Sequence, residues 1–209
     1  EFMKLQRHLR RCKMQLVEIF GSIQGEGIHL GMPCVFIRTQ GCNLHCSFCD
    51  TKESWGDQAK LDMSIPEIVE KVSQYNVQLV VITGGEPCIQ PMLQDLVDQL
   101  TIKGFRVAIE TNGTQETPQG AWITCSPKED ADYKISPYCK PNELKYVVTS
   151  SFDAEKAIPS GLRKLYAGNI WLQPEGSDMV NMWKKCMEIA AADPRLRVGV
   201  QLHKIMEVK

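Results

Sequence analysis

The chain has 209 residues, and its 24 Lys and Arg nearly balance its 25 Asp and Glu, giving a formal net charge of −1. This balance provides no whole-protein field that would attract nucleic acid or an anionic membrane. No apolar run approaches the roughly 20 residues needed to span a bilayer. We therefore expect one soluble domain with a sizeable core and with neither nucleic acid nor membrane as a partner.

The first thirteen residues differ in composition from the rest of the chain. Two residues precede Met3 like a cloning remnant, and the basic stretch that follows lacks the apolar segment of a signal peptide. This stretch could be an RNA-binding or targeting arm, but a solvated leader ahead of a start at Met14 is the favoured interpretation. We assign residues 1–13 to a remnant and leader, and residues 14–209 to a single domain.

Strand-like and helix-like segments alternate along the chain. Ser64-Ile65-Pro66-Glu67 has the sequence of a capping box with proline in the first turn, which predicts a helix that reaches about Tyr75. Gly104 and Asp193-Pro194 are typical of helix ends. In chain order, the patterns predict strands at 15–20 and 34–39, a helix at 64–75, a strand at 79–83, a helix at 91–103, strands at 106–110, 122–125, 144–149 and 170–172, a helix at 178–192 and a strand at 197–202.

The alternation of these segments predicts an α/β fold with a mainly parallel sheet. Several strand segments are near-continuous hydrophobic runs, as expected for strands that are covered on both faces. The chain falls short of the ~250 residues of a complete eight-fold barrel. We therefore expect an open, partial TIM-like (β/α) barrel of about six mainly parallel strands with a reduced helix set, and a ligand site at the carboxyl ends of the strands.

Cysteine is frequent, with nine residues in the chain. Without a signal peptide, this number favours a reducing compartment, the cytoplasm, rather than a secreted disulfide framework. Cys34 and Cys125 lie in strand-like runs, and we expect them to be small buried hydrophobic residues.

Three of the cysteines lie in the run Cys42-Asn43-Leu44-His45-Cys46-Ser47-Phe48-Cys49, directly after a predicted strand. Three thiolates on one loop can bind three corners of a [4Fe–4S] cluster, because soft thiolate ligands suit iron–sulfur clusters. Zinc is the alternative, but it would need a fourth ligand such as His45 or a distant cysteine, and no second pair is present. The spacing favours a cluster with one iron open to a small molecule.

This Cys-x3-Cys-x2-Cys run, with an aromatic residue before its last cysteine, resembles the signature of the radical S-adenosylmethionine (SAM) superfamily. Further motifs, in this order and spacing from about Met14 to the C-terminus, resemble the 7-carboxy-7-deazaguanine synthase family within it. These motifs are Gln24-Gly25-Glu26-Gly27, Arg38, Gly41 to Thr51, Thr83 to Pro87, Ser126-Pro127-Lys128, Gln173-Pro174 and Gln201-x-His203-Lys204.

The resemblance implies a lyase of queuosine-type 7-deazapurine biosynthesis that converts 6-carboxy-5,6,7,8-tetrahydropterin to 7-carboxy-7-deazaguanine with loss of ammonia. It implies a [4Fe–4S] cluster, SAM and Mg²⁺ as cofactors, a flavodoxin-like electron donor and a homodimer. It implies no catalytic side chain, because a 5′-deoxyadenosyl radical from SAM abstracts the substrate hydrogen.

The resemblance also implies roles for individual residues, and several have a physical rationale of their own. Two glycines at a strand end let a ligand approach the backbone closely, and Glu86 can accept from an ammonium. Arg38 could bind a substrate carboxylate with two hydrogen bonds or form a surface ion pair, and the residues alone leave both open. The implied roles are cluster ligation by Cys42, Cys46 and Cys49; SAM binding by Phe48, Cys49, Asp50, Gly85, Glu86, Ser126, Pro127, Lys128, Gln173, Pro174 and Glu175; substrate binding by Ile23, Gln24, Gly25, Glu26, Arg38, Thr83 and His203; and Mg²⁺ binding by Thr51.

Two other functions remain open on the sequence. One is a radical SAM enzyme that activates a glycyl-radical partner protein, and the other is a non-catalytic, zinc-stabilised binding module. The chain also ends in Ile205-Met206-Glu207-Val208-Lys209, without the Gly-Pro ending of some relatives. This departure leaves open whether the terminal carboxylate reaches the substrate.

Overall fold

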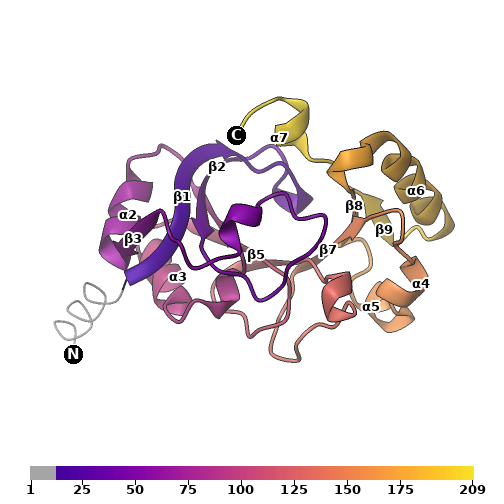
Figure 1. Ribbon diagram of the computed structural model, residues 1–209, viewed down its shortest axis with the longest axis horizontal. Helices are drawn as coiled ribbons and strands as arrows, with labels where there is room; N and C mark the ends of the chain where they lie inside the picture. Colours follow the sequence, from indigo (N-terminus) through magenta and orange to yellow (C-terminus); the bar gives the residue numbers. More distant parts are fainter. Residues whose placement is uncertain (1–12) are drawn as a thin grey trace.

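The computed structural model describes residues 13–209, so most of the predicted leader lies outside the described residues. Nine strands form a sheet in the order β3-β1-β2-β4-β5-β6-β7-β8-β9 (Figure 1). β2 and β4 to β9 are parallel neighbours, whereas β1 pairs antiparallel with β2 and β3. The strands are β1 (Lys13–Ile23), β2 (Pro33–Thr39), β3 (Leu61–Ser64), β4 (Leu79–Gly84), β5 (Arg106–Thr111), β6 (Trp122–Cys125), β7 (Glu143–Val148), β8 (Ile170–Pro174) and β9 (Leu196–Val198).

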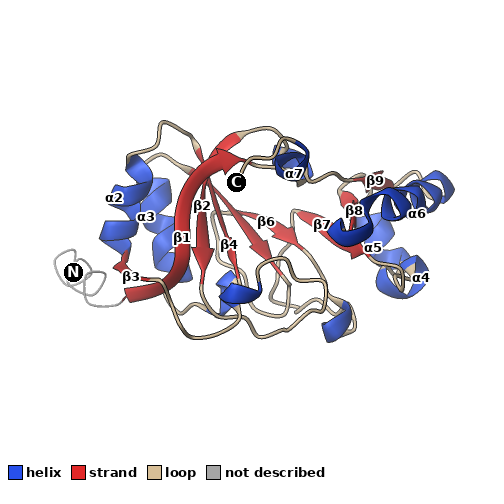
Figure 2. Ribbon diagram, turned by 45° about the horizontal axis from the view of Figure 1, so that its top comes forward, coloured by secondary structure: helices blue, strands red, loops and turns tan. Residues whose placement is uncertain are grey.

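Apart from α7, the α-helices lie against the outside of the curved sheet in two groups (Figure 2). Figure 2 shows α2 and α3 beside the first strands, and α4, α5 and α6 beside β7 to β9. The α-helices are α2 (Ile65–Ser73), α3 (Leu93–Ile102), α4 (Ala154–Ala157), α5 (Ser160–Leu165), α6 (Met179–Ala192) and α7 (Leu202–Ile205). None of the helices in the described range is long and apolar enough to cross a membrane.

The prediction of an open partial barrel is confirmed, because the edge strands β3 and β9 do not pair with each other. The capping box is also present: the backbone N and the Oγ of Ser64 donate to Glu67 Oε2 over 2.7 and 2.6 Å. Cys34 and Cys125 are fully buried, as expected.

The structure corrects the predicted elements in three places. Seven strands are mutually parallel rather than about six, and Lys13 belongs to β1 rather than to a leader. The short elements β3, α4 and α5 were not predicted, because four to six residues carry too little periodicity to stand out. The last predicted strand, 197–202, ends at Val198, because the chain then turns into α7.

Residues of β7 alternate between the two faces of the sheet, and this alternation gives the barrel a polar interior. Leu144, Tyr146 and Val148 are buried in the hydrophobic core. Lys145 and Val147 lie on the opposite face and line a cavity inside the curve of the sheet. The sheet therefore separates the hydrophobic core under the helices from a cavity whose lining includes charged side chains.

Candidate functional site

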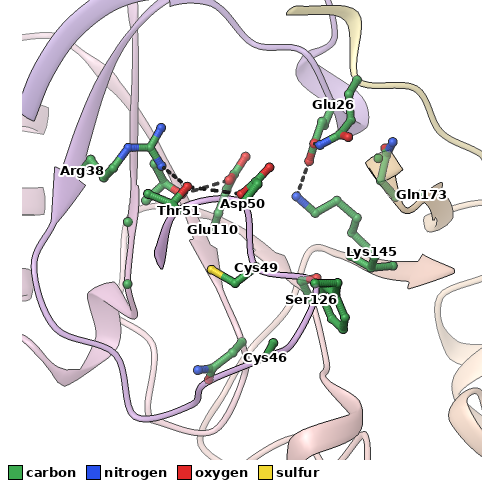
Figure 3. A pocket seen from close by; sticks show the side chains of 18 of the residues that line it. Glu26, Arg38, Cys46, Cys49, Asp50, Thr51, Glu110, Ser126, Lys145 and Gln173 are labelled. Carbon is green, nitrogen blue, oxygen red and sulfur yellow. Dashed lines mark hydrogen bonds and ion pairs between the residues drawn. The ribbon is translucent and has the colours of Figure 1, made fainter. Parts of the chain in front are cut away.

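A cavity of about 290 Å³ lies within the curve of the sheet, at the carboxyl ends of the parallel strands. This is the position expected for a ligand site in a parallel α/β sheet. All of the predicted site residues line the cavity except Ile23, Gly25, Glu86 and Pro127. Figure 3 shows several of these side chains, from the cysteine loop on one side to Glu26 and Gln173 on the other.

The three predicted cluster ligands lie on the loop after β2, and Cys42, Cys46 and Cys49 all line the cavity. Hydrogen bonds hold this loop at its base, where Gly41 N donates to Ser54 O over 2.7 Å. A side-chain bridge ties the loop to the end of β5, since Asn112 Nδ2 donates to Asn43 Oδ1 over 2.9 Å. The thiols are therefore presented to the cavity by a loop that is fixed at several points.

The donor arrangement fits a cluster better than a zinc ion. Zinc needs four ligands around one point, whereas each iron of a cubane takes one thiolate. Within residues 13–209, no three His, Cys, Asp or Glu side chains converge on a position for a single metal ion. His45, the suggested fourth zinc ligand, instead packs edge-on against the Trp55 ring at 5.0 Å. Three thiols that line one cavity can each bind a different iron of a cluster.

Of the residues predicted to bind SAM, Ser126, Lys128 and Gln173 lie at the carboxyl ends of β6 and β8. Lys128 Nζ donates to Ser126 Oγ over 2.5 Å, and burial lowers the pKa of this lysine, as does the charge of Lys145. Gln173 is buried, and its Nε2 is one of two buried side-chain polar atoms without a partner in the described part of the chain. A buried donor without an acceptor fits a bound ligand that accepts from it.

The two glycines of the Gly84-Gly85-Glu86 motif have a packing role in addition to the ligand approach that their sequence suggested. A Cβ on Gly84 would lie 2.3 Å from Thr39 N, and one on Gly85 would lie 1.9 Å from Gly41 O. The glycines therefore let the backbone at the end of β4 approach the backbone at the end of β2, although both also line the cavity.

Glu86 requires a correction, because it is completely buried and does not line the cavity. Its carboxylate accepts from Thr111 Oγ1 (2.7 Å), Asn112 N (2.6 Å) and Cys88 N (2.9 Å). Burial raises the pKa of this carboxyl group despite these hydrogen bonds. Glu86 thus positions the end of β5, and we do not retain it as an acceptor for a ligand ammonium.

Replacing Gly85 with alanine is expected to destabilise the fold by at least about 2 kcal/mol, because the new Cβ meets a backbone oxygen that cannot rotate away. Since that oxygen belongs to Gly41, we also expect weaker iron incorporation at the adjacent cysteine loop. Urea unfolding and iron content after reconstitution measure the two effects. Gly161→Ala is the matched control, because nothing lies within 4 Å of its Cβ. Equal stabilities of the two variants would contradict this account.

Arg38 and Thr51 lie on the β1–β2 side of the cavity. Arg38 Nε donates to Glu18 Oε1 over 3.1 Å, its Nη1 is 3.4 Å from Thr51 Oγ1, and its guanidinium lies 5.7 Å from the Phe20 ring centroid. The ion pair predicted as one alternative is therefore present. The guanidinium nevertheless lines the cavity, so it is also accessible to a ligand.

Gln24 and Thr83 meet at Glu110, a residue that the sequence analysis did not select. Gln24 Nε2 and Thr83 Oγ1 donate to the two carboxylate oxygens of Glu110, each over 3.0 Å. Glu110 is the second-last residue of β5, and its charge at the end of a strand-like run was the available signal. The three side chains form one hydrogen-bonded group on the cavity wall.

Glu26 forms a buried ion pair with Lys145, which the sequence analysis also missed. Gln201 Nε2 donates to the other carboxylate oxygen of Glu26 over 2.8 Å. The available signal for Lys145 was its charge two residues after Glu143, on alternate positions of the sequence Glu-Leu-Lys-Tyr-Val-Val of β7. Polar residues at period two in such a strand indicate a polar face.

The C-terminal segment closes one side of the cavity. His203 lies against Gly25, where a Cβ would be 2.0 Å from His203 Nδ1, and Leu202 N donates to Gly25 O over 2.9 Å. Gly25 therefore packs against the C-terminal segment and does not line the cavity. Lys204 Nζ reaches Asp50 Oδ2 over 3.0 Å, and Lys209 lies at the cavity, where its backbone oxygen accepts from Ser22 Oγ.

Known proteins with similar sequences cover nearly the whole chain. Residues 36–123 match the Radical SAM superfamily. The 7-carboxy-7-deazaguanine synthase of Aquifex aeolicus is 36% identical, over 93% of this chain and 94% of the relative. That of Bacteroides thetaiotaomicron is 38% identical, over 92% and 97%.

A solved structure agrees with these sequence relatives. The crystal structure of QueE from Escherichia coli superposes with a TM-score of 0.77 and 30% identity, over 97% of this chain and 99% of that chain. Sequence identity of 30% over nearly the full length of both chains indicates a family relationship and not only a shared fold. The chain belongs to the 7-carboxy-7-deazaguanine synthase family, within the radical SAM superfamily.

Proposed function

We propose that this chain converts 6-carboxy-5,6,7,8-tetrahydropterin to 7-carboxy-7-deazaguanine and ammonia, as a radical SAM lyase of queuosine-type 7-deazapurine biosynthesis. The observation that carries this proposal is that one cavity combines three thiols with an arginine and four carboxylates. The product and ammonia together contain every atom of the substrate, so the reaction needs no net oxidant. Curated relatives that carry this name over nearly their whole length do not favour a glycyl-radical-activating enzyme or a zinc module.

The thiols of Cys42, Cys46 and Cys49 would hold the [4Fe–4S] cluster. Ser126, Lys128 and Gln173 would hold SAM, together with the neighbouring residues Phe48, Asp50, Gly85, Pro174 and Glu175, which all line the cavity. The chemistry that these groups supply when bound is the formation of a 5′-deoxyadenosyl radical. The chain's own contribution is to bind and orient the reactants and to exclude water.

Arg38 would hold the substrate carboxylate, since a guanidinium can donate two parallel hydrogen bonds to it. Glu26 would accept from the 2-amino and ring N–H groups of the pterin, which are donors that match a carboxylate. Gln24, Thr83 and His203 line the same cavity. The pterin would thus be held at both ends, beside the cysteine loop.

Thr51 would be a ligand to Mg²⁺. Its hydroxyl lies at the cavity and contacts Asp50 Oδ1 at 3.2 Å, so two oxygen atoms are adjacent there. Mg²⁺ usually keeps several waters and takes few protein ligands. The remaining ligands would come from water and from the substrate.

A cytoplasmic location, a homodimer and a flavodoxin-like electron donor complete the proposal. The location is supported by the eight cysteines of the described part, all of which are free thiols, as is usual in a reducing compartment. The dimer and the donor rest on the family resemblance. Sedimentation of the full chain and reduction of the cluster by purified flavodoxin would test them.

The reaction is tested by oxygen-free incubation of the reconstituted enzyme with SAM, a reductant, Mg²⁺ and the carboxylated tetrahydropterin. We expect SAM-dependent formation of 7-carboxy-7-deazaguanine and release of ammonia, measured by chromatography and mass spectrometry. Release of 5′-deoxyadenosine without the deazaguanine would retain the superfamily chemistry and refute the proposed substrate. Omitting Mg²⁺, or replacing Thr51 with alanine, separately tests the metal.

A further inference from the structure

Lys145 lies inside the barrel among side chains that carry charge. Its side chain is 10% exposed, and its ammonium pairs with Glu26, whose side chain is 11% exposed (Figure 3). A lysine this buried is uncommon unless its charge is matched, because removing an ammonium from water costs several kcal/mol. The buried charge of Lys145 must therefore be stabilised by the charged side chains that surround it.

The pair is electrostatically stable in its charged form. Burial alone lowers the pKa of Lys145, but the negative charges of Glu110 and Glu26 raise it well above its usual value. Burial likewise raises the pKa of Glu26, yet the charge of Lys145 and the hydrogen bonds from Lys145 and Gln201 lower it overall. Lys145 is consequently a poor proton donor and a strong stabiliser of the Glu26 carboxylate.

The backbone around Glu26 is also fixed. Glu26 N donates to Gln24 Oε1 over 3.1 Å. The next turn is tied to the base of β7, because Ile28 N donates to Glu143 Oε2 over 3.1 Å. Gly27 has a φ of +65°, and a Cβ there would lie 2.5 Å from Glu143 Oε1, so glycine is required. The remaining freedom lies in the Glu26 side chain, which Lys145 and Gln201 restrain.

Resting on the function proposed above, we propose that Lys145 is a positioning residue for the substrate: it holds Glu26 ionised and oriented as the hydrogen-bond acceptor for the N–H groups of the pterin. A carboxylate has about four lone-pair directions, of which Lys145 and Gln201 use two. The others are available to donors on a ligand. A neutral Glu26 would lose acceptor capacity and would present a proton to the pterin N–H groups.

The test is the equilibrium binding of 6-carboxypterin, the oxidised and unreactive form of the substrate, to cluster-reconstituted enzyme. We expect Lys145→Met to weaken binding about 10- to 100-fold near pH 6, the cost of a lost charge-assisted hydrogen bond. The ratio of the variant's Kd to the wild-type Kd should fall as pH rises from about 5 to about 7.5. This direction follows because burial without a cation raises the pKa of Glu26, so higher pH restores the carboxylate.

Taking the ratio to wild type removes the titrations that do not depend on Lys145 or Glu26. From the C-terminal segment, His203 faces Glu26, and burial lowers the pKa of this histidine. Other elements contribute further charges that act on Glu26, Lys145 or His203, namely Glu110 (β5), Lys128 (after β6), Glu143 (β7), Asp50 (cysteine loop) and Lys204 (α7).

A double variant distinguishes positioning from direct contact. If Lys145 acts through Glu26, adding Lys145→Met to Glu26→Gln should change the Kd by less than about threefold, because the partner is already neutral. A further loss of tenfold or more in that background, or a Kd ratio that does not vary with pH, would overturn the inference. It would indicate that Lys145 touches the substrate itself.

Separate controls distinguish a loss of binding caused by misfolding from a failure of the proposed function. Lys164→Met, at an exposed position of α5, should bind 6-carboxypterin like wild type. Thermal unfolding of each variant identifies a loss that comes from misfolding, and Lys145→Arg, which keeps the charge, should restore part of the affinity if the variant with methionine is unstable. Failure of wild-type enzyme to bind the pterin would refute the proposed function. Normal binding by Lys145→Met would refute only the role of Lys145.

Discussion

Cys46→Ala is expected to abolish turnover while leaving a folded chain. Cys46 is buried, but it lies on a loop outside the sheet and belongs to neither hydrophobic core cluster of the described residues, so we expect its thiol to contribute little to core packing. Without this ligand, two thiols cannot hold a cubane, and the site for SAM chelation is lost with it. The iron and sulfide contents should fall from about four of each per chain to near zero, and neither 5′-deoxyadenosine nor deazaguanine should form.

The matched control is Cys186→Ala. Cys186 is fully buried in α6, where it packs in the hydrophobic core. Its loss should lower the free energy of unfolding by about 1 kcal/mol and leave iron content and turnover intact. Full activity in Cys46→Ala, or loss of iron in both variants, would refute the assignment of the cluster loop.

Arg38→Met is expected to reduce kcat/KM for the pterin about 100-fold or more, mainly through KM. The physical reason is the loss of two charge-assisted hydrogen bonds to the substrate carboxylate, worth roughly 3 kcal/mol together. SAM cleavage without the pterin should continue, because Arg38 lies on the other side of the cavity from Ser126 and Gln173 (Figure 3). Steady-state kinetics and the release of 5′-deoxyadenosine measure the two effects.

Glu18→Gln separates substrate binding from the ion pair that the structure also shows. Glu18 pairs with Arg38 over 3.1 Å but does not line the cavity. If Arg38 served only this ion pair, the two variants would have similar defects. We expect Glu18→Gln to change kcat/KM by less than a few-fold, since partly exposed pairs contribute about 1 kcal/mol or less. The kcat/KM of Arg38→Lys should lie between that of Arg38→Met and that of wild type, because lysine keeps the charge but lacks the planar guanidinium that donates two parallel hydrogen bonds.

The elements that could be predicted have strong local signals. The helix at α2 follows from the capping box at Ser64, and the central strands follow from their β-branched runs. The elements that were missed are short or depend on neighbours. Asp153 caps α4 through Glu155 N and Lys156 N, and the buried Arg163 then donates to Ala154 O and Ile158 O, contacts that no local pattern predicts.

The residues of the candidate site also divide into those with a local sequence signal and those that only the fold brings together. Cys42, Cys46 and Cys49 lie within eight residues of one another, so their spacing in the sequence already favours a cluster. Glu110 and Lys145 are separated from Gln24 and Glu26 by more than 80 residues, and only the sheet brings them together. The sequence also suggested that Glu86 would face a ligand, but burial behind the glycines directs its carboxylate to Thr111 and Asn112.

By itself, the sequence determined the α/β class, the loop that carries three thiols and the family to which the chain belongs, because these depend on residue types at short and constant spacings. The tertiary structure decided which charges face each other within the barrel. Lys145 and Glu26 are 119 residues apart, and their pairing depends on the alternation of β7 and the seating of the Gly25 segment. Electrostatic interactions depend on distance and burial in space, and a linear sequence contains neither.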